Sequence, residues 1–236
     1  SLAPPALLVE LTSSLDLATG FRSLSERQRT LRGAIDWSYR LLEPTEQRLF
    51  ARLGVFSGSF DAEAAAGVCG RGPTSPVGED ASPVGYFVER LASLAGKSMI
   101  QMADAPEGSA PRFRLLITLR EFAVEQLARL DEQEEIAGHH LAYYRRLAEE
   151  TAPLLEQTEQ AAWLQRLAAE HDNARAALAF GLERPEYRVE ALRLATALRG
   201  FWRFRGLFTE GRHWLHQLLA AAPPDAPLDV LANAYS

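Results

Sequence analysis

The feature that most constrains this chain is the helical spacing of its apolar residues along most of its length. From Glu132 onward the spacing predicts helices over about 134–155, 158–170, 172–183, 187–204 and 208–221, with breaks at Pro185 and Pro223. Before that point it predicts helices over 7–17, 25–42, 44–53, 62–68, 84–95 and 118–130, with Ser25 and Asp61 as caps. The pattern indicates a mainly α protein.

One short region departs from helical spacing. The runs 98–102 and 112–116 alternate polar and apolar residues, and a loop rich in Pro, Gly and Ser separates them. This pattern predicts a small β-hairpin. Residues 70–83 have no apolar periodicity and are expected to form a loop. Three helices followed by a two-stranded wing is the winged-helix arrangement, so we expect a winged-helix domain over 25–127.

The second part of the chain, 128–236, is expected to be a domain of helical repeats. The stretch 192–225 fits a tetratricopeptide repeat of about 34 residues, with Trp202 on the first helix, Gly206 in the turn and Gly211 on the second helix. Residues 228–235 would open another repeat. Because a repeat buries its apolar face on its neighbour, we expect this end to be frayed or packed on another molecule, exposing Leu228, Leu231 and Tyr235.

Charge argues against nonspecific nucleic-acid binding. The 236 residues include 25 basic and 31 acidic side chains, a net charge of −6. The helix before the wing, which enters the major groove in DNA-binding versions, offers only Glu89 and Arg90, with Lys97 just beyond it. The sequence therefore favours a winged helix that packs against protein. No apolar run approaches the roughly 18–20 residues that span a bilayer, and the expected location is the cytoplasm.

Four blocks in order carry a family resemblance: Arg27–Leu42, Glu46–Phe60, Leu94–Met99 and Arg112–Ala123. They resemble the winged-helix segment of STAND-class NTPases, above all the large bacterial ATP-binding transcriptional regulators of the LuxR-like and antibiotic-pathway types. The resemblance implies an ATPase core, a helical arm ending in residues 1–24, the winged helix and a helical-repeat sensor. It also implies ATP and ADP as cofactors of the full-length protein.

No P-loop motif lies within the chain, so the ATPase core is expected upstream of Ser1. Gly96-Lys97-Ser98 resembles the end of such a motif, but Lys97 follows a helix rather than a strand, which indicates coincidence. Many relatives carry Met-His-Asp after the wing, where the His touches the nucleotide phosphate. Here those positions are Leu115, Leu116 and Ile117, and we expect Leu115 and Ile117 to pack in the wing and core.

One basic and aromatic cluster, residues 199–206, is a candidate binding site. Arg193, Arg203 and Phe204 occupy positions that line the concave groove of such repeats, where they could bind an acidic peptide or a phosphate-bearing effector. In the alternative interpretation, Phe201 and Trp202 are core residues and the Arg side chains pair with nearby Glu residues. The sequence leaves both open.

No catalytic constellation is visible. His139 and His140 are adjacent and His213 and His216 lie one turn apart, but neither pair has a third ligand at zinc spacing. Cys69 has no His partner and is expected to pack as a small apolar side chain. We therefore expect neither catalytic nor metal-binding residues, and no enzyme in this fragment.

The favoured hypothesis is a regulatory and sensor fragment of a STAND-type regulator, with the winged helix as a lever that responds to nucleotide state. Its expected partners are the upstream ATPase core and a protein or small-molecule effector on the repeats, not DNA or a membrane. The alternatives are a DNA-binding winged-helix transcriptional regulator and a stand-alone peptide-binding scaffold of helical repeats. The start at Ser1 and the end within an expected helix indicate a piece of a longer protein.

Overall fold

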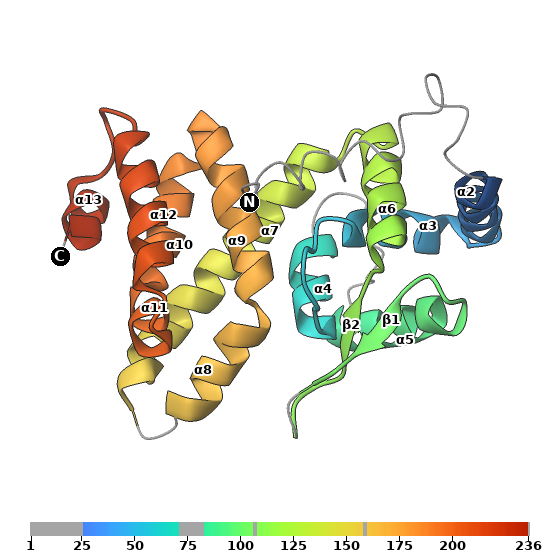
Figure 1. Ribbon diagram of the computed structural model, residues 1–236, viewed down its shortest axis with the longest axis horizontal. Coiled ribbons are helices and arrows are strands. Elements are labelled where there is room, and N and C mark those ends of the chain that lie inside the picture. Colours follow the sequence, from blue (N-terminus) through green and yellow to red (C-terminus); the bar gives the residue numbers. More distant parts are fainter. Residues whose placement is uncertain (1–25, 71–82, 106–107, 158–159, 236) are drawn as a thin grey trace, which may run out of the picture. The chain divides into compact units, whose positions relative to one another are not determined.

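The computed structural model describes residues 26–70, 83–105, 108–157 and 160–235. These residues are mainly helical, with one two-stranded sheet between helices (Figure 1). The expected helix over 7–17, the cap at Ser25, the arm over 1–24 and most of the loop at 70–83 lie outside the described residues. The chain divides into two compact units, Ser1–Leu41 and Leu42–Ser236.

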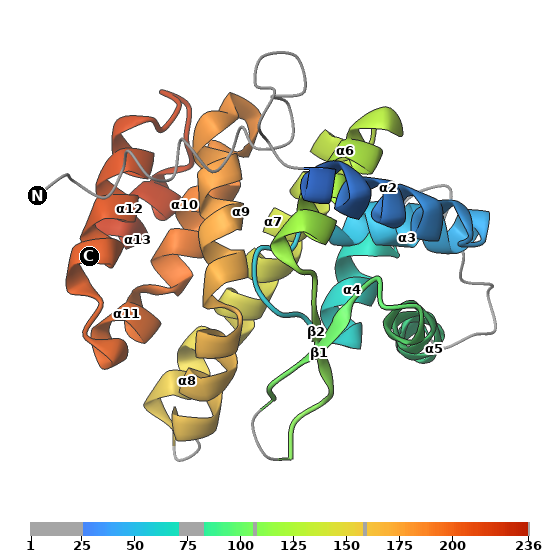
Figure 2. The ribbon, with the colours of Figure 1, turned by 45° about the vertical axis from the view of Figure 1, so that its right-hand side comes forward.

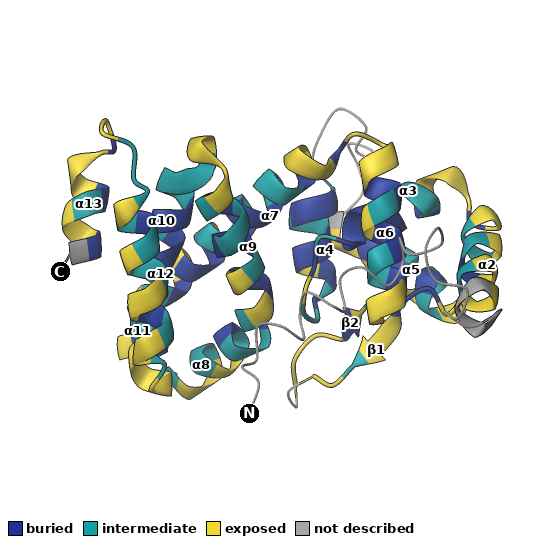
Figure 3. Cartoon of the chain, turned by 45° about the horizontal axis from the view of Figure 1, so that its top comes forward, coloured by how far each residue is buried: buried dark blue, intermediate teal, exposed yellow. Residues whose placement is uncertain are grey.

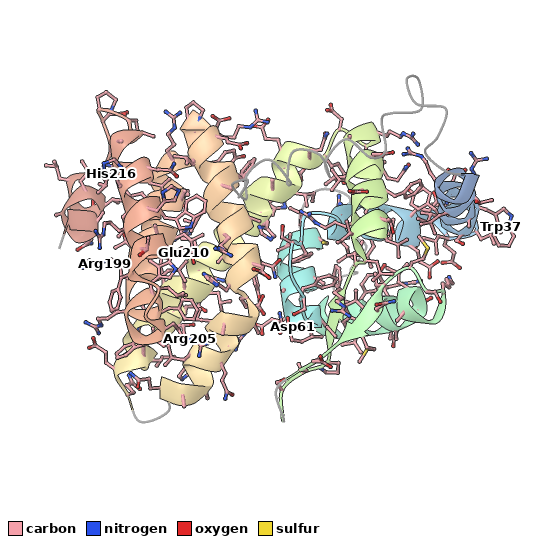
Figure 4. The ribbon with its side chains drawn as sticks, viewed as in Figure 1. Trp37, Asp61, Arg199, Arg205, Glu210 and His216 are labelled. Atoms are coloured by element: carbon pink, nitrogen blue, oxygen red, sulfur yellow. The ribbon has the colours of Figure 1, made fainter. Side chains whose placement is uncertain are left out.

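The first unit contributes one described helix, α2 (Glu26–Arg40). Asp36 and Arg40 form an ion pair of 2.8 Å one turn apart on it, as suits an exposed helical face. Trp37 is 65% exposed (Figure 4).

The second unit contains the remaining elements. Its helices and 3-10 turns are α3 (Pro44–Leu53), α4 (Ala62–Cys69), α5 (Pro83–Gly96), α6 (Ile117–Arg129), α7 (Gln133–Thr151), η2 (Ala152–Glu156), α8 (Gln160–Ala169), α9 (His171–Glu183), η3 (Pro185–Tyr187), α10 (Arg188–Ala197), α11 (Arg199–Arg205), α12 (Phe208–Ala220) and α13 (Leu228–Tyr235). Its strands are β1 (Gln101–Ala103) and β2 (Arg112–Arg114). The predicted winged-helix range therefore begins in the first unit, and both predicted domains contribute to the second. The domain boundaries stay predictions.

The predicted hairpin is confirmed. Strands β1 and β2 pair antiparallel with Met102 opposite Phe113, and Phe60 forms an isolated bridge on the other side of Phe113. This bridge ties the turn that follows α3 to the hairpin. Asp61 then caps α4 as expected, accepting a hydrogen bond of 2.8 Å from the Ala64 amide.

Helix α7 connects two halves of this unit, an earlier half from α3 to α6 that includes the hairpin and a later, helical half from α8 to α13 (Figure 2). It packs against α4 in the earlier half and against α9 and α10 in the later half. The helices turn their buried faces inward, toward α7 and toward one another (Figure 3). Ile136, Leu141 and Tyr144 on α7 are almost fully buried. This single long helix therefore shares its core with both halves.

Two helices predicted as continuous are divided. The helix expected over 134–155 ends at Thr151, and residues 152–156 form a 3-10 turn because Pro153 lacks the N–H that an α-helix needs there. The helix expected over 187–204 divides at Leu198 (φ −78°, ψ −5°) into α10 and α11. Phe201 and Trp202, just beyond the break, are buried. The break between α10 and α11 therefore directly precedes two buried aromatic side chains.

The tight turn between α11 and α12 depends on two glycines. Gly206 closes α11 with φ +70°, a left-handed conformation that glycine adopts without strain. Gly211 on α12 lies against Trp202, and a Cβ there would be 2.7 Å from the indole Cε3. The helical pair predicted for this region is present, while its assignment as a tetratricopeptide repeat stays a prediction.

The last helix, α13, is formed and docked on α10 and α12. It buries Val230 and Ala234 and leaves Leu228 83% exposed. Leu231 is half-buried, and the side chain of Tyr235 is not described. The helix is therefore formed rather than frayed, because Val230 and Ala234, four residues apart, provide its packing face, while Leu228 is exposed as expected. Packing of this end on another molecule stays a prediction.

Candidate functional site

A buried polar cluster in the second unit joins the hairpin to the start of α9. We call it the hairpin–helix junction, and its members are Ser59, Arg112, Tyr144, Glu170 and Asn173. Arg112 lies on β2, and Glu170 precedes the first residue of α9. Both side chains are about 95% buried, and Arg112 Nη1 donates to Glu170 Oε1 at 2.5 Å. The pair connects segments that are far apart in the chain.

The remaining polar atoms of this pair are also satisfied. Arg112 Nε donates to Ser59 Oγ at 2.9 Å, and Nη2 donates to the Ser59 carbonyl at 2.7 Å. Glu170 Oε2 accepts from the Tyr144 hydroxyl at 2.9 Å. A buried ion pair is stable only when its other donors and acceptors find partners, and this one meets that condition.

Asn173 holds the turn that follows α3. Its Oδ1 accepts hydrogen bonds of 2.9 Å from the amides of both Ser57 and Gly58, and its Nδ2 donates to the Ser59 carbonyl at 2.8 Å. The side chain is fully buried. One side chain on α9 therefore satisfies three backbone groups of a turn more than 100 residues earlier.

The pKa values of Arg112 and Tyr144 are both shifted upward, so each group keeps its proton. Desolvation alone would lower the pKa of Arg112, but the hydrogen bond that Arg112 donates to Glu170 and the charge of that carboxylate raise the pKa above its usual value. Burial and the neighbouring Glu170 carboxylate raise the pKa of Tyr144 well above 10. Arg112 therefore stays charged and Tyr144 stays a hydrogen-bond donor across the physiological range.

His140 lies beside the junction between two aromatic rings, 5.4 Å from Phe56 and 4.7 Å from Tyr144 between ring centroids. Burial, together with the charge of Arg120, lowers the pKa of His140 to about 3. The ring is therefore neutral at physiological pH. Arg120 itself donates from Nε to the Phe56 carbonyl at 2.8 Å, so it also stabilises the turn that follows α3.

A second buried ion pair joins α3 to the start of α7. Arg52 Nε donates to Glu132 Oε2 at 2.7 Å, and Arg52 Nη1 donates to the Cys69 carbonyl at 2.7 Å. Cys69 is 2% exposed, and burial raises the pKa of its thiol to about 12. The expectation that Cys69 packs as a small apolar side chain is confirmed, because a thiol with such a pKa is not a nucleophile.

Lys97 has a structural partner in place of a phosphate. Its Nζ contacts both carboxylate oxygens of Glu46, at 2.7 and 2.6 Å, and Ser93 Oγ donates to the same carboxylate at 2.7 Å. Burial alone would raise the pKa of Glu46, but these bonds lower it below its usual value. Lys97 thus holds α5 to α3.

The predicted contribution of Leu115 and Ile117 to the core holds only in part. Leu115 is half-buried, but Ile117 is 78% exposed. Ile117 is the first residue of α6, and the buried face of that helix begins at Leu119 and continues through Phe122. Its position at the helix start turns its side chain toward solvent, so the expected core role of Ile117 is wrong.

The three predicted effector residues lie on α10 and α11. Arg203 is paired with Glu156 at 3.3 Å and stacks over the ring of Phe204 at 4.8 Å. Phe204 is 41% exposed and Arg193 is half-buried. The structure gives no contact that joins Arg193 to the other two. Phe201 and Trp202 are buried, as the alternative interpretation required.

The histidine pairs also have separate positions. His213 and His216 are both exposed on α12, whereas His140 is buried in the core. In the part of the chain that the structure describes, no group of three or more His, Cys, Asp or Glu side chains is placed to hold a metal ion. Nor does any helix in that part have the length and apolar character to cross a membrane.

The sequence analysis missed the junction residues Arg112, Glu170 and Asn173. A signal was present at one end, because the polar run 170–173 lies between two apolar helical patterns. A short solvent-exposed linker has the same composition, so the run does not by itself indicate burial. At the other end, Arg112 alternates with Phe113 like any strand residue on a solvated face. Only the fold shows that the two ends meet.

Comparisons with known proteins relate the chain to mycobacterial regulators. It is 36% identical over 216 residues, 89% of its length, to "Putative HTH-type transcriptional regulator Rv0890c" of Mycobacterium tuberculosis, and equally to Mb0914c of Mycobacterium bovis, which has the same description. It is 31% identical over 147 residues, 62% of its length, to "Uncharacterized protein Rv0894" of Mycobacterium tuberculosis, of which it covers 34%.

The chain spans about a quarter (23%) of the length of the two named regulators. No protein-family model matches it. No solved structure matches it either. The relatives agree with the expectation of a transcriptional regulator, and the ATPase and repeat assignments stay predictions.

Proposed function

We propose that this chain is a coupling segment of a transcriptional regulator, in which the helical half passes a conformational signal to the hairpin and α5. The observation that carries the proposal is the buried Arg112–Glu170 pair, which ties β2 to the start of α9. A displacement of α9 cannot leave β2 in place without exposing or unpairing a buried charge. The names of the mycobacterial relatives support the regulatory context.

Within this proposal, α8 to α13 receive an effector or partner, and the earlier half acts as the lever. A nucleotide-dependent ATPase core, with ATP or ADP bound, would lie in another part of the full-length cytoplasmic protein. The chain itself would then have no catalytic role. These assignments rest on the resemblance of the four sequence blocks.

Hydrogen exchange tests the coupling. The variant Glu170→Gln removes the charge at the junction and keeps the size of the side chain, so we expect faster amide exchange at β1 and β2. Glu149→Gln on α7 removes one of the two carboxylates that pair with the more exposed Arg145, the other being Glu190, and serves as the matched control. Unchanged exchange at the hairpin in Glu170→Gln would show that the junction does not couple the two halves.

A second candidate function is DNA binding through α5. It is favoured by the HTH-type description of the relatives and by the position of α5 immediately before the hairpin. Against it, the exposed positions of α5 include Val84, Val88 and Glu89 rather than basic side chains. Arg90 lies 3.5 Å from Glu43, and Lys97 is paired with Glu46.

A mobility-shift titration of duplex DNA at low salt separates the two candidates. The coupling function predicts no discrete shift by the 236-residue chain. A clear shift that weakens steeply with added salt, and that weakens further in Arg90→Ala, would favour DNA binding instead.

A further inference from the structure

The outward face of α5 forms one wall of an apolar groove. The hairpin forms the opposite wall, and the start of α4 closes one side. The groove has a volume of about 620 Å³, and its apolar lining includes Val84, Val88, Ala92 and Ala95 on α5 and Met102 and Phe113 on the hairpin. It lies next to the hairpin–helix junction, since Phe113 neighbours Arg112 and the charge of Asp61 acts on Arg112.

The apolar lining is open to solvent. Val84, Val88 and Met102 are 41%, 50% and 59% exposed. Val84, Val88 and Ala92 follow one another at intervals of four residues, so they lie on one helical face. Together with Ala95 they form a stripe about 16 Å long, three turns of helix. An exposed apolar stripe of this kind, with a polarisable Met on its far wall, is typical of a surface that binds another helix.

The charged side chains of the groove are acidic. The two that line it are Asp61 and Glu63, at the start of α4 (Figure 4 labels Asp61). Glu63 is paired with Arg166 at 3.0 Å. Asp61 caps α4 and, among the residues that the structure describes, has no ion-pair partner. Glu89 adds an exposed carboxylate next to Val88 on α5.

We propose that this groove binds an amphipathic helix of a partner protein, with an apolar stripe against α5 and the hairpin and with Lys or Arg residues beside Asp61. Helix-in-groove recognition uses apolar anchors at i, i+4 and i+7, the spacing of Val88, Ala92 and Ala95 on α5. The acidic side gives the complex its charge preference and orientation. The same acidity disfavours nucleic acid as the occupant.

Synthetic peptides test this proposal on the 236-residue chain. The probe is a fluorescent helical peptide of about 14 residues with Leu at i, i+4, i+7 and i+11 and Lys at one end. A matched peptide has Glu in place of Lys. We expect the Lys peptide to bind more tightly, measured by fluorescence anisotropy. We expect Val88→Glu and Met102→Glu each to weaken its binding about tenfold or more.

Two further variants separate specific docking from general stickiness. Asp61→Asn keeps a side chain that caps α4 equally well and removes the charge, so it should reduce the preference for the Lys peptide. Ile117→Glu alters an apolar side chain that is also exposed but lies outside the groove lining, and it should leave binding unchanged. Circular dichroism checks that every variant is folded, and Val88→Thr replaces Val88→Glu if the latter is not.

Several outcomes would overturn the proposal. One is that Val88→Glu and Met102→Glu bind the Lys peptide as tightly as the wild-type chain does. Another is that Asp61→Asn keeps the wild-type preference for the Lys peptide over the Glu peptide. If Val88→Glu instead abolishes self-association of the free chain, or abolishes binding to duplex DNA, the groove has a different occupant. Because Val88→Glu and Met102→Glu leave Arg112, Glu170 and their charged neighbours unchanged, failure of the groove proposal is distinguishable from failure of the coupling function, on which this proposal does not rest.

Discussion

Arg112 on the hairpin and Glu170 at the start of α9 are 58 residues apart in the chain and form an ion pair of 2.5 Å between side chains that are almost completely buried. Further contacts of this pair reach Ser59, in the turn before α4, and the Tyr144 hydroxyl on α7. The junction is therefore a point where the turn, β2, α7 and the start of α9 depend on one another. Four measurements test this and related features of the structure.

Arg112→Met should destabilise the chain by about 3–5 kcal/mol, because it leaves the Glu170 carboxylate buried without its counter-charge. The measurement is the free energy of unfolding from urea denaturation. Arg146→Met is the matched control, since Arg146 is half exposed and lies 3.8 Å from Glu150, and it should cost less than about 1 kcal/mol. Equal effects of the two substitutions would contradict a buried and essential pair.

Asn173→Ala should cost about 1–3 kcal/mol, because the amides of Ser57 and Gly58 lose a buried acceptor. The side chain of Asn233 is exposed on α13, so Asn233→Ala should have little effect on unfolding. If thermal melting shows no difference between the two variants, water or another group must replace the Asn173 amide.

Gly211→Ala should destabilise the α11–α12 pair, because the new methyl group would lie 2.7 Å from the Trp202 ring. The expected cost is about 1–3 kcal/mol, the usual range for an overpacked core. Gly96→Ala is the control, since nothing lies within 4 Å of the added carbon. The free energy of unfolding measures this cost, and the near-ultraviolet circular dichroism of the chain, to which Trp202 contributes as one of four Trp residues, should change in the first variant alone.

The neutral His140 should make the chain less stable as the pH falls. In the unfolded chain this histidine takes up a proton below its ordinary pKa of 6.5, while in the folded chain the pKa is about 3. The stabilisation is therefore fully present above pH 6.5 and is lost progressively between pH 6.5 and 3. At pH 5 the loss amounts to about 2 kcal/mol.

Urea denaturation of a His140→Phe variant at pH 7.5 and pH 5 measures this contribution. The difference in free energy of unfolding between the two pH values should be smaller in the variant than in the wild-type chain. His216→Gln, at an exposed position, should keep the wild-type difference. A variant with the full wild-type difference would assign the pH effect to other groups.

Local pattern predicted the elements well where one face of a segment is apolar. The hairpin, the cap at Asp61 and most helix positions appear as expected, because side-chain periodicity and capping chemistry act over a few residues. The core role expected of Ile117 and the continuous helix expected over 187–204 were wrong for a different reason. An apolar side chain at a helix start can face solvent, and apolar periodicity alone does not show where a helix is interrupted.

The sequence by itself determined a mainly helical chain with one hairpin, an acidic balance and a resemblance to bacterial regulators. The tertiary structure alone decided which charged residues are buried and paired. Arg112 has nothing in its local sequence that distinguishes it from a solvated strand residue, and the polar run that holds Glu170 and Asn173 fits an exposed linker equally well. Their role depends on desolvation and on partners many residues away, and both arise only when the chain is folded.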